Sequence, residues 1–100
     1  MSTFSERLRA ARKTAGLSQE RLGMEAGLEP ASASARMNQY ENGVHVPGKG
    51  TVQQIANALG LPAAYFYCDD DDEAELLKLF HSLKKDDRER VLSLAQQLAI

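Results

Sequence analysis

Hydrophobic residues along this chain recur three or four positions apart, in short segments that end at glycine or proline. Residues spaced in this way lie on one face of an α-helix, and no segment shows the strict alternation typical of a β-strand. The first two segments run over residues 4–15 and 19–25. Gly16 and Gly27 follow them as stop signals, and Ser18 can cap the second segment through its hydroxyl group. The chain therefore begins with two predicted helices.

The helical pattern continues to about residue 67. Pro30 suits the first turn of a third helix that runs to about Glu41, because the N–H that proline lacks would have no partner there. A loop over residues 44–50 precedes a fourth helix, for which Thr51 is the expected cap. The apolar face of this fourth helix consists of Val52, Ile55, Ala56 and Leu59. A short fifth helix is predicted to follow Pro62.

The pattern changes after Cys68, where residues 69–72 are four consecutive aspartates. Such a run stays in solvent and forms either a hinge or the start of a helix, whose dipole favours acids. Two further helices are predicted, over about 73–83 and 88–99, with Lys84-Lys85 at the C-terminal end of the first. Their apolar stripes are Leu76, Leu79, Phe80 and Leu83 in the first, and Val91, Leu94, Ala95 and Leu98 in the second.

These segments predict an all-α protein of two parts. Residues 1–67 form a five-helix domain, and residues 68–100 form an acidic hinge followed by a C-terminal helical hairpin. The chain has 100 residues, 43% hydrophobic and 26% charged, which is typical of one globular domain. The net charge of −2 is unevenly divided, since the first part carries seven Lys/Arg against five Asp/Glu and the second carries five against nine. This division is compatible with a mildly basic binding part joined to an acidic part that has another role.

Residues that carry catalysis or bind metals in other proteins do not form suitable groups in this sequence. Cys68 is the only cysteine and has no histidine near it, while His45 and His81 are isolated, so neither a nucleophile nor a zinc site is predicted. The aspartate run lacks the spacing and the central glycine of a calcium loop. The sequence also has no phosphate-binding glycine loop. We therefore expect no enzymatic activity, no metal and no cofactor.

Cysteine content and hydropathy predict the compartment. A single cysteine excludes an internal disulfide and fits a reducing environment. No apolar run approaches the roughly 18 residues that cross a membrane, and the charged N-terminal residues are unlike a secretory signal. We expect a cytoplasmic protein.

Residues 17–43 contain two short motifs, Leu-Ser-Gln-Glu-Arg-Leu-Gly-Met-Glu-Ala-Gly at 17–27 and Tyr-Glu-Asn-Gly at 40–43. Leu22 and Ala26 are spaced to face a core, and the small Gly23 allows two helices to approach each other. In these motifs the chain resembles the phage-repressor (Xre/Cro-like) helix-turn-helix family, and the resemblance extends to about residue 66. It implies a DNA-binding domain that docks its third helix in the major groove.

The chain departs from the family pattern between the two motifs. Twelve residues lie there, roughly one helical turn more than the family usually has, and the extra residues fall near 28–31. They lengthen either the turn, which preserves the usual docking, or the third helix, which then protrudes further into the groove. Pro30 favours the longer helix.

Placing the third helix at about 100° per residue separates a core face from a face that reads DNA. Arg36 can bond guanine in a bidentate manner, Gln39 or Asn38 can pair with adenine, and the methyl group of Ala35 can touch thymine. The core face consists of Ala33, Met37 and Tyr40. The predicted base contacts are Ser32, Ser34, Ala35, Arg36, Asn38 and Gln39.

Other residues of the motifs have roles that the resemblance implies. Gln19 matches a glutamine that bonds a phosphate and braces the third helix, and Arg12 and Glu41 match a partly buried ion pair. In the loop after the third helix, polar residues suit phosphate contacts, although solvated loop residues explain them equally well. The predicted phosphate contacts are Gln19, Asn42, His45 and Lys49.

The sequence thus predicts a nucleoid-associated transcriptional regulator, in the first place a repressor, that occupies an approximately palindromic DNA operator as a homodimer. Two heads about 34 Å apart address successive turns of one groove face. The stripes of residues 73–99 suit the dimer seam, or else pack on their own domain. A rival function is that of an antitoxin-like or other protein-interaction module, whose C-terminal helices engage a protein partner and whose DNA binding is secondary.

Overall fold

The structure, a computed structural model, describes residues 2–100, and these form helices without any β-strand. The elements are α1 (Thr3–Thr14), α2 (Gln19–Glu25), α3 (Pro30–Glu41), α4 (Lys49–Leu59), the 3-10 helix η1 (Ala63–Tyr67), α5 (Asp71–Ser82) and α6 (Lys85–Leu98). The predicted all-α fold is confirmed. The fifth predicted helix is the short 3-10 helix η1, and not an α-helix.

Local signals begin and end the first two helices, and among them Ser18, Gly16 and Gly27 act as predicted. The Oγ atom of Ser2 accepts a bond from the backbone N–H of Ser5 at the start of α1, and Ser18 Oγ accepts one from Arg21 N–H at the start of α2. Gly16 and Gly27 follow these helices with positive φ angles of 72° and 87°, which glycine adopts without steric cost. These caps explain why the sequence alone located the first two helices.

The predicted starts of two later helices are wrong. α4 begins at Lys49, because the Gly48 carbonyl accepts the first helical bond, from Val52 N–H, and Thr51 lies inside the helix. At the other junction, Lys85 begins α6, so Lys84-Lys85 does not lie at the C-terminal end of α5. The guanidinium group of Arg88 takes that place instead, donating bonds to the last carbonyls of this turn. These bonds are Nε to Phe80 O (3.1 Å), Nε to Leu83 O (3.1 Å) and Nη2 to His81 O (2.8 Å).

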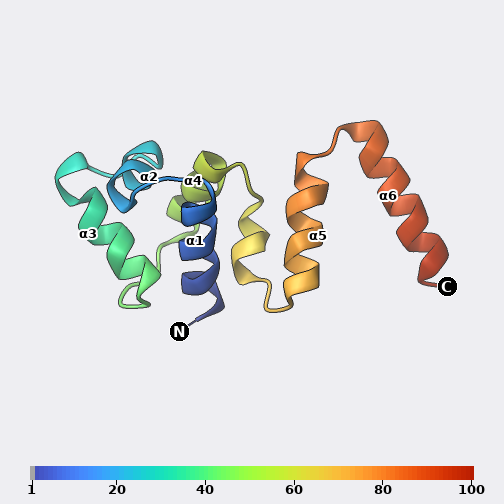
Figure 1. The fold of residues 1–100 in the computed structure, drawn as a ribbon, viewed down its shortest axis with the longest axis horizontal. Coiled ribbons are helices and arrows are strands. Elements are labelled where there is room, and N and C mark those ends of the chain that lie inside the picture. The colour runs from blue at the N-terminus through green and yellow to red at the C-terminus, as the bar shows by residue number, and fades with distance from the viewer. Residues whose placement is uncertain (1) are drawn as a thin grey trace.

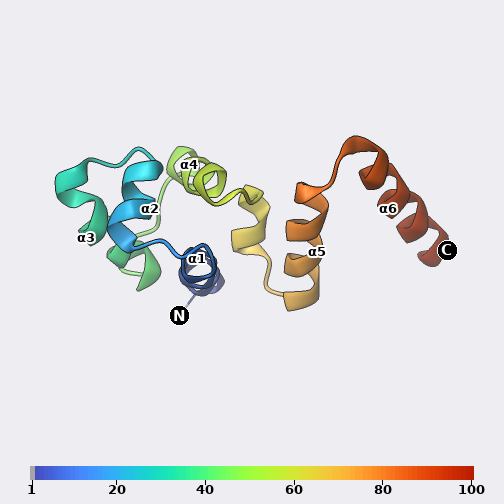
Figure 2. The same ribbon diagram turned by 45° about the horizontal axis from the view of Figure 1, so that its top comes forward.

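The core lies among α1, α2, α3, α4 and η1, which gather at one end of an elongated molecule of 50 × 26 × 23 Å (Figure 1). Its fully buried side chains include Leu8, Leu22, Met37, Ile55 and Phe66. α5 packs beside η1, and α6 extends away at the far end (Figure 2). No described helix has the length and apolar character that spanning a membrane would require.

α2 and α3 approach each other closely at Gly23, as the sequence predicted. A Cβ atom built on this glycine would lie 2.8 Å from the Cβ atom of Ala33 and 3.0 Å from its carbonyl oxygen. Such a contact cannot be relieved by a side-chain rotation, because one of the atoms belongs to the backbone. The close approach therefore positions α3 against α2.

Gly23→Ala is expected to destabilise the protein by about 1–2 kcal/mol, since the clash exceeds the roughly 1 kcal/mol that alanine gains in helix propensity. Urea denaturation followed by circular dichroism measures the effect. Gly50→Ala in α4 is the matched control, because nothing lies within 4 Å of the added methyl group. This control is expected to gain up to about 1 kcal/mol. Equal stability of the two variants would contradict the packing argument.

The two C-terminal helices are buried to different extents. Ala74 of α5 is 1% exposed against the domain, whereas no residue of α6 is buried. Asp70 caps α5 by accepting a bond from Glu73 N–H, so the aspartate run forms a helix start. The division into residues 1–67 and 68–100 stays a prediction.

Candidate nucleic-acid interface

The connection between α2 and α3 is short, and α3 is long. Four residues, 26–29, separate the two helices, and α3 begins at Pro30 and contains 12 residues. The extra residues near 28–31 therefore lie partly in this connection (28–29) and partly in the first turn of α3 (30–31). Pro30 stands at the first helical position, as its lack of an N–H favours.

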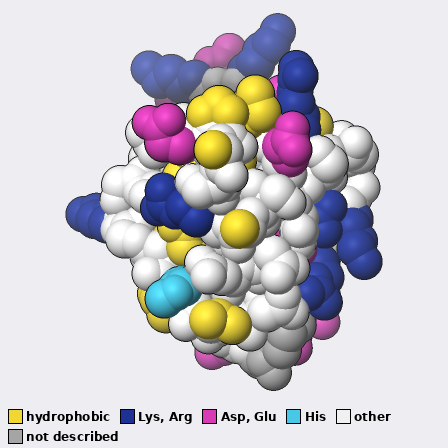
Figure 3. Space-filling view, turned by 90° about the vertical axis from the view of Figure 1, so that its left-hand side faces the viewer, with side chains coloured by type: hydrophobic (Ala, Val, Ile, Leu, Met, Phe, Trp, Pro, Cys, Tyr) yellow, Lys and Arg dark blue, Asp and Glu magenta, His cyan; other side chains and the backbone are white. Residues whose placement is uncertain are grey.

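α3 has a buried face and an accessible face. Ala33, Met37 and Tyr40 are buried, as predicted. Of the predicted base-contacting residues, Ser34, Ala35 and Asn38 are exposed, and Ser32, Arg36 and Gln39 are half-buried. Figure 3 shows this end of the molecule, on which uncharged polar side chains and backbone predominate and Lys and Arg side chains are scattered. Small and polar side chains of this kind allow close approach to another surface.

Arg36 does not extend freely into solvent. Its Nη2 atom donates a bond to the hydroxyl oxygen of Tyr40 at 2.8 Å, and the guanidinium carbon lies 5.9 Å from the centre of the Tyr40 ring. Arg36 and Gln39 line one side of a hollow whose other side is the loop of His45 and Gly48. Tyr40, predicted only as a core residue, thus also contacts a predicted base-contacting residue. The i, i+4 spacing of Arg36 and Tyr40 was the signal that predicts this contact.

Gln19 braces α3, as the resemblance implies. Its Nε2 atom donates to Asn38 Oδ1 at 3.2 Å and to Glu41 Oε1 at 3.3 Å. Asn42 Nδ2 donates to the same Asn38 oxygen at 3.0 Å, and Arg9 Nη2 donates to Asn42 Oδ1 at 3.0 Å. This network holds the polar side chains along one edge of α3 in fixed positions. Arg9 is a member of this network that the sequence pattern does not predict.

Glu41 and Arg12 form a buried ion pair between α3 and α1. The Glu41 side chain is 0% exposed and accepts bonds from Arg12 Nε at 2.6 Å and Arg12 Nη2 at 3.0 Å. Burial alone raises the pKa of Glu41, but the hydrogen bonds from Arg12, Gln19 and Arg9 and the positive charge of Arg12 together outweigh it, and the pKa lies below its usual value. The hydrogen bond to Glu41 raises the pKa of Arg12 in turn. Both groups are therefore charged at neutral pH.

The remaining predicted phosphate contacts lie just beyond α3. Asn42 and His45 are exposed after its C-terminal end, and Lys49 is exposed at the first position of α4. Backbone N–H groups in the first turn of a helix favour anions, so Lys49 stands at an end of α4 that suits a phosphate. Together with Gln19, these residues border the accessible face of α3.

Cys68 shows none of the features of a catalytic thiol. Burial and the negative charge of Glu73, whose carboxylate oxygen lies 3.7 Å from the sulfur, raise the pKa of Cys68. A raised pKa keeps the thiol protonated and unreactive. Within residues 2–100, no three His, Cys, Asp or Glu side chains gather as metal ligands would.

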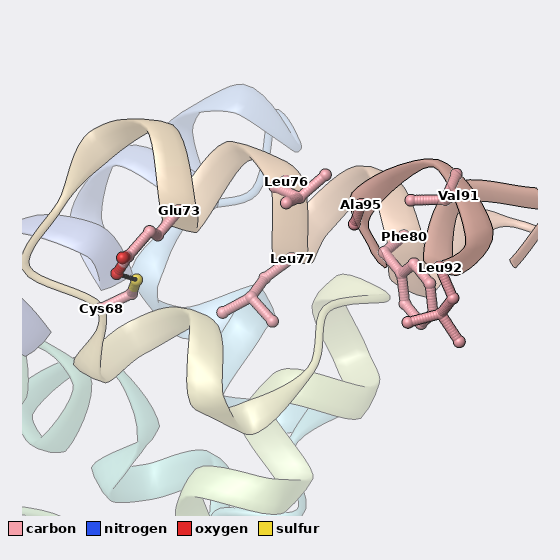
Figure 4. A pocket seen from close by; sticks show the side chains of 8 residues that line it. All are labelled: Cys68, Glu73, Leu76, Leu77, Phe80, Val91, Leu92 and Ala95. Atoms are coloured by element: carbon pink, nitrogen blue, oxygen red, sulfur yellow. Dashed lines mark hydrogen bonds between the residues drawn. The ribbon is translucent and has the colours of Figure 1, made fainter. Parts of the chain in front are cut away.

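An apolar groove of about 410 Å³ lies between α5 and α6 (Figure 4). Leu76, Leu77 and Phe80 of α5 line it, together with Val91, Leu92 and Ala95 of α6, and Cys68 and Glu73 lie at one end. Several leucines of these helices are half-exposed or more: Leu76 (55%), Leu79 (51%), Leu94 (56%) and Leu98 (76%). Both C-terminal helices thus carry accessible apolar surface.

Most of this chain is similar to known proteins. A family model described as a helix-turn-helix domain matches residues 5–68. Among solved structures, the chain is similar to the crystal structure of the transcriptional regulator BswR, with 43% sequence identity, coverage of 97% of this chain and 94% of that chain, and a TM-score of 0.86. No curated protein matches the chain. The similarity to a solved structure thus extends beyond α4 and η1 to the C-terminal helices.

Proposed function

This chain belongs to the helix-turn-helix family of DNA-binding transcriptional regulators, and from this premise we propose that it represses transcription by docking α3 in the major groove of an operator. The observation that carries the proposal is the accessible face of α3, which presents small and polar side chains while its opposite face packs on α1 and α2. Membership of the family also confirms the predictions that the chain resembles such regulators and is not an enzyme.

The residues of the interface divide into two groups. Arg36 recognises guanine and Gln39 or Asn38 recognises adenine, because their donors and acceptors match the edges of these bases in the major groove. The base-reading group is Ser32, Ser34, Ala35, Arg36, Asn38 and Gln39. The phosphate-binding group is Gln19, Asn42, His45 and Lys49, and it fixes the orientation of α3 on the duplex.

A homodimer through residues 73–99 completes the proposed regulator. α6 has 14 residues and buries none of them within one chain, yet isolated helices of this length are marginal in water. A second copy that covers the apolar stripe of α6 stabilises the helix and places two copies of α3 on one operator. Two linked heads bind far more tightly than one, because the second contact becomes intramolecular.

Arg36→Ala and Lys49→Ala test the two groups of contacts. The test uses a DNA site that the parent protein selects from random sequences. Arg36→Ala is expected to lower the affinity for this site about 5- to 150-fold and to relax the base preference at one position of the site. Lys49→Ala is expected to weaken binding to all sequences alike and to reduce the salt slope by about one. Fluorescence anisotropy titrations at several salt concentrations measure both effects.

Lys78→Ala is the matched control for these titrations, because Lys78 is exposed on α5, away from α3. Its removal is expected to leave the sequence preference unchanged. If neither Arg36→Ala nor Lys49→Ala alters the binding of DNA, the contact assignment is wrong.

The exposed groove between α5 and α6 favours a second candidate function, that of an antitoxin-like module that binds another protein there. In this case DNA binding is secondary, and its affinity is weak and insensitive to sequence. Nanomolar affinity for a selected operator that falls steeply with salt supports the regulator instead.

A further inference from the structure

Arg7 of α1 joins the DNA-binding domain to the start of α5. Its Nε atom donates to the carbonyl oxygen of Cys68 at 2.9 Å, and its Nη2 atom donates to the carbonyl oxygen of Asp69 at 3.4 Å. The same Nη2 atom lies 3.0 Å from a carboxylate oxygen of Asp71, the first residue of α5. These partners follow Arg7 by 61 to 64 residues in sequence.

The surroundings of Arg7 hold the guanidinium group in place. Its side chain is only 16% exposed, and the guanidinium carbon lies 5.7 Å from the centre of the Tyr65 ring in η1. Thr3 bonds the carboxylate of Asp69, and the ring of Phe4 lies 5.5 Å from that of Tyr67. The segment between η1 and α5 is therefore attached to α1 along its length.

These contacts constrain the position of residues 68–71, at which α5 begins. A planar guanidinium group that bonds two carbonyls and a carboxylate defines their relative positions more narrowly than an ammonium group does. Arg7 therefore helps to fix the direction of α5 relative to α3, together with the bond from Thr3 to Asp69 and the buried Ala74. α5 leads into the helices that are proposed to dimerise.

We propose that Arg7 is a positioning residue that sets the spacing between the two operator half-sites that the regulator accepts. The inference rests on the proposed function, since it requires a dimer with two DNA-reading heads. One added base pair moves a half-site by about 3.4 Å and turns it by about 34° around the duplex. Two heads on rigid joints reject such a change, whereas heads on flexible joints tolerate it.

The experiment measures the affinity for a set of DNA duplexes that differ only in the spacing between the two selected half-sites. One duplex has the preferred spacing, and the others have one or two base pairs fewer or more. For the unaltered full-length protein, a change of one base pair is expected to weaken binding at least about tenfold. Arg7→Gln is expected to reduce this discrimination to about threefold or less, with affinity for a single half-site within about twofold of the parent's. Lys78→Gln removes the same charge from α5 and is expected to keep the full discrimination.

Arg7→Lys provides a second variant in case Arg7→Gln folds poorly. Lysine keeps the positive charge near Asp71, but its donors sit on one nitrogen and not on a planar fork that spans the three acceptors, so partial loss of discrimination is expected. If both variants fold and dimerise yet reject altered spacings as strongly as the parent, the role of Arg7 is wrong while the proposed function stands. If the parent itself binds two half-sites no more tightly than one, the proposal of a dimeric regulator is wrong, and so is the inference about Arg7.

Discussion

Glu41→Gln is expected to destabilise the protein by about 3–5 kcal/mol, because it removes one charge of a buried pair and leaves Arg12 without its counterion. The Glu41 side chain is 0% exposed and that of Arg12 is 13% exposed, so water can replace little of the lost interaction. For a domain of this size, each kcal/mol lost from the free energy of unfolding lowers the Tm by about 4–8 °C. Urea denaturation and thermal melting both measure the loss.

Glu25→Gln is the matched control for this substitution. Glu25 also pairs with an arginine, Arg21, but their side chains are 38% and 67% exposed. Exposed pairs of this kind contribute less than about 1 kcal/mol. If Glu41→Gln proves as mild as Glu25→Gln, the pair does not hold α1 and α3 together.

The contribution of Glu41 to the stability of the fold decreases at low pH. Its pKa in the folded protein lies below the unfolded value of about 4.3, so folding favours the ionised form. The stabilisation is fully present above about pH 5 and is lost as the pH falls through the folded pKa. The difference in stability between the parent and Glu41→Gln is therefore expected to shrink below about pH 4. A difference that stays constant from pH 7 to pH 3 contradicts this assignment.

Leu94→Asp is expected to convert the proposed dimer into monomers and to lower operator affinity by about 10²- to 10⁴-fold. The leucine is 56% exposed on the apolar stripe of α6, where a second copy would have to bury the introduced carboxylate. Because no residue of α6 is buried within one chain, the fold of the DNA-binding domain is expected to remain. Sedimentation over a concentration series and operator titrations measure the two effects.

Ser93→Asp introduces the same charge on the opposite side of α6 and serves as the control. It is expected to dimerise and to bind the operator as the parent does. Dimers of Leu94→Asp at the concentrations that dimerise the parent would place the seam elsewhere on the molecule.

Signals within a few residues determined much of this fold. Ser18 and Gly27 delimit α2, and Pro30 begins α3, because caps and proline act on the backbone beside them. The spacing of Ala33, Met37 and Tyr40 likewise located the buried face of α3. The same reasoning failed at α4, where Thr51 carried a capping signal but the helix begins at Lys49 after a glycine without a capping side chain.

The candidate interface was predicted residue by residue, but its internal bonds were not. Helical periodicity places Arg36 and Gln39 on the accessible side of α3, and a resemblance supplied Gln19, Arg12 and Glu41. Only the packed structure shows that Arg9 of α1 donates a bond to Asn42, beyond the end of α3. Contacts between residues of different segments depend on how the helices pack, and the periodicity within one helix carries no information about that packing.

Local patterns in the sequence predicted which segments are helical and which of their residues are apolar, and the resemblance of residues 17–43 predicted a helix-turn-helix. Only the packed structure shows that Arg88 bonds the carbonyls at the end of α5 and that Arg7 joins α1 to the start of α5. Helix formation follows from interactions between residues three or four positions apart, so it can be read locally. Arg7 and Cys68 meet across 61 residues, and such contacts exist only once the chain has folded.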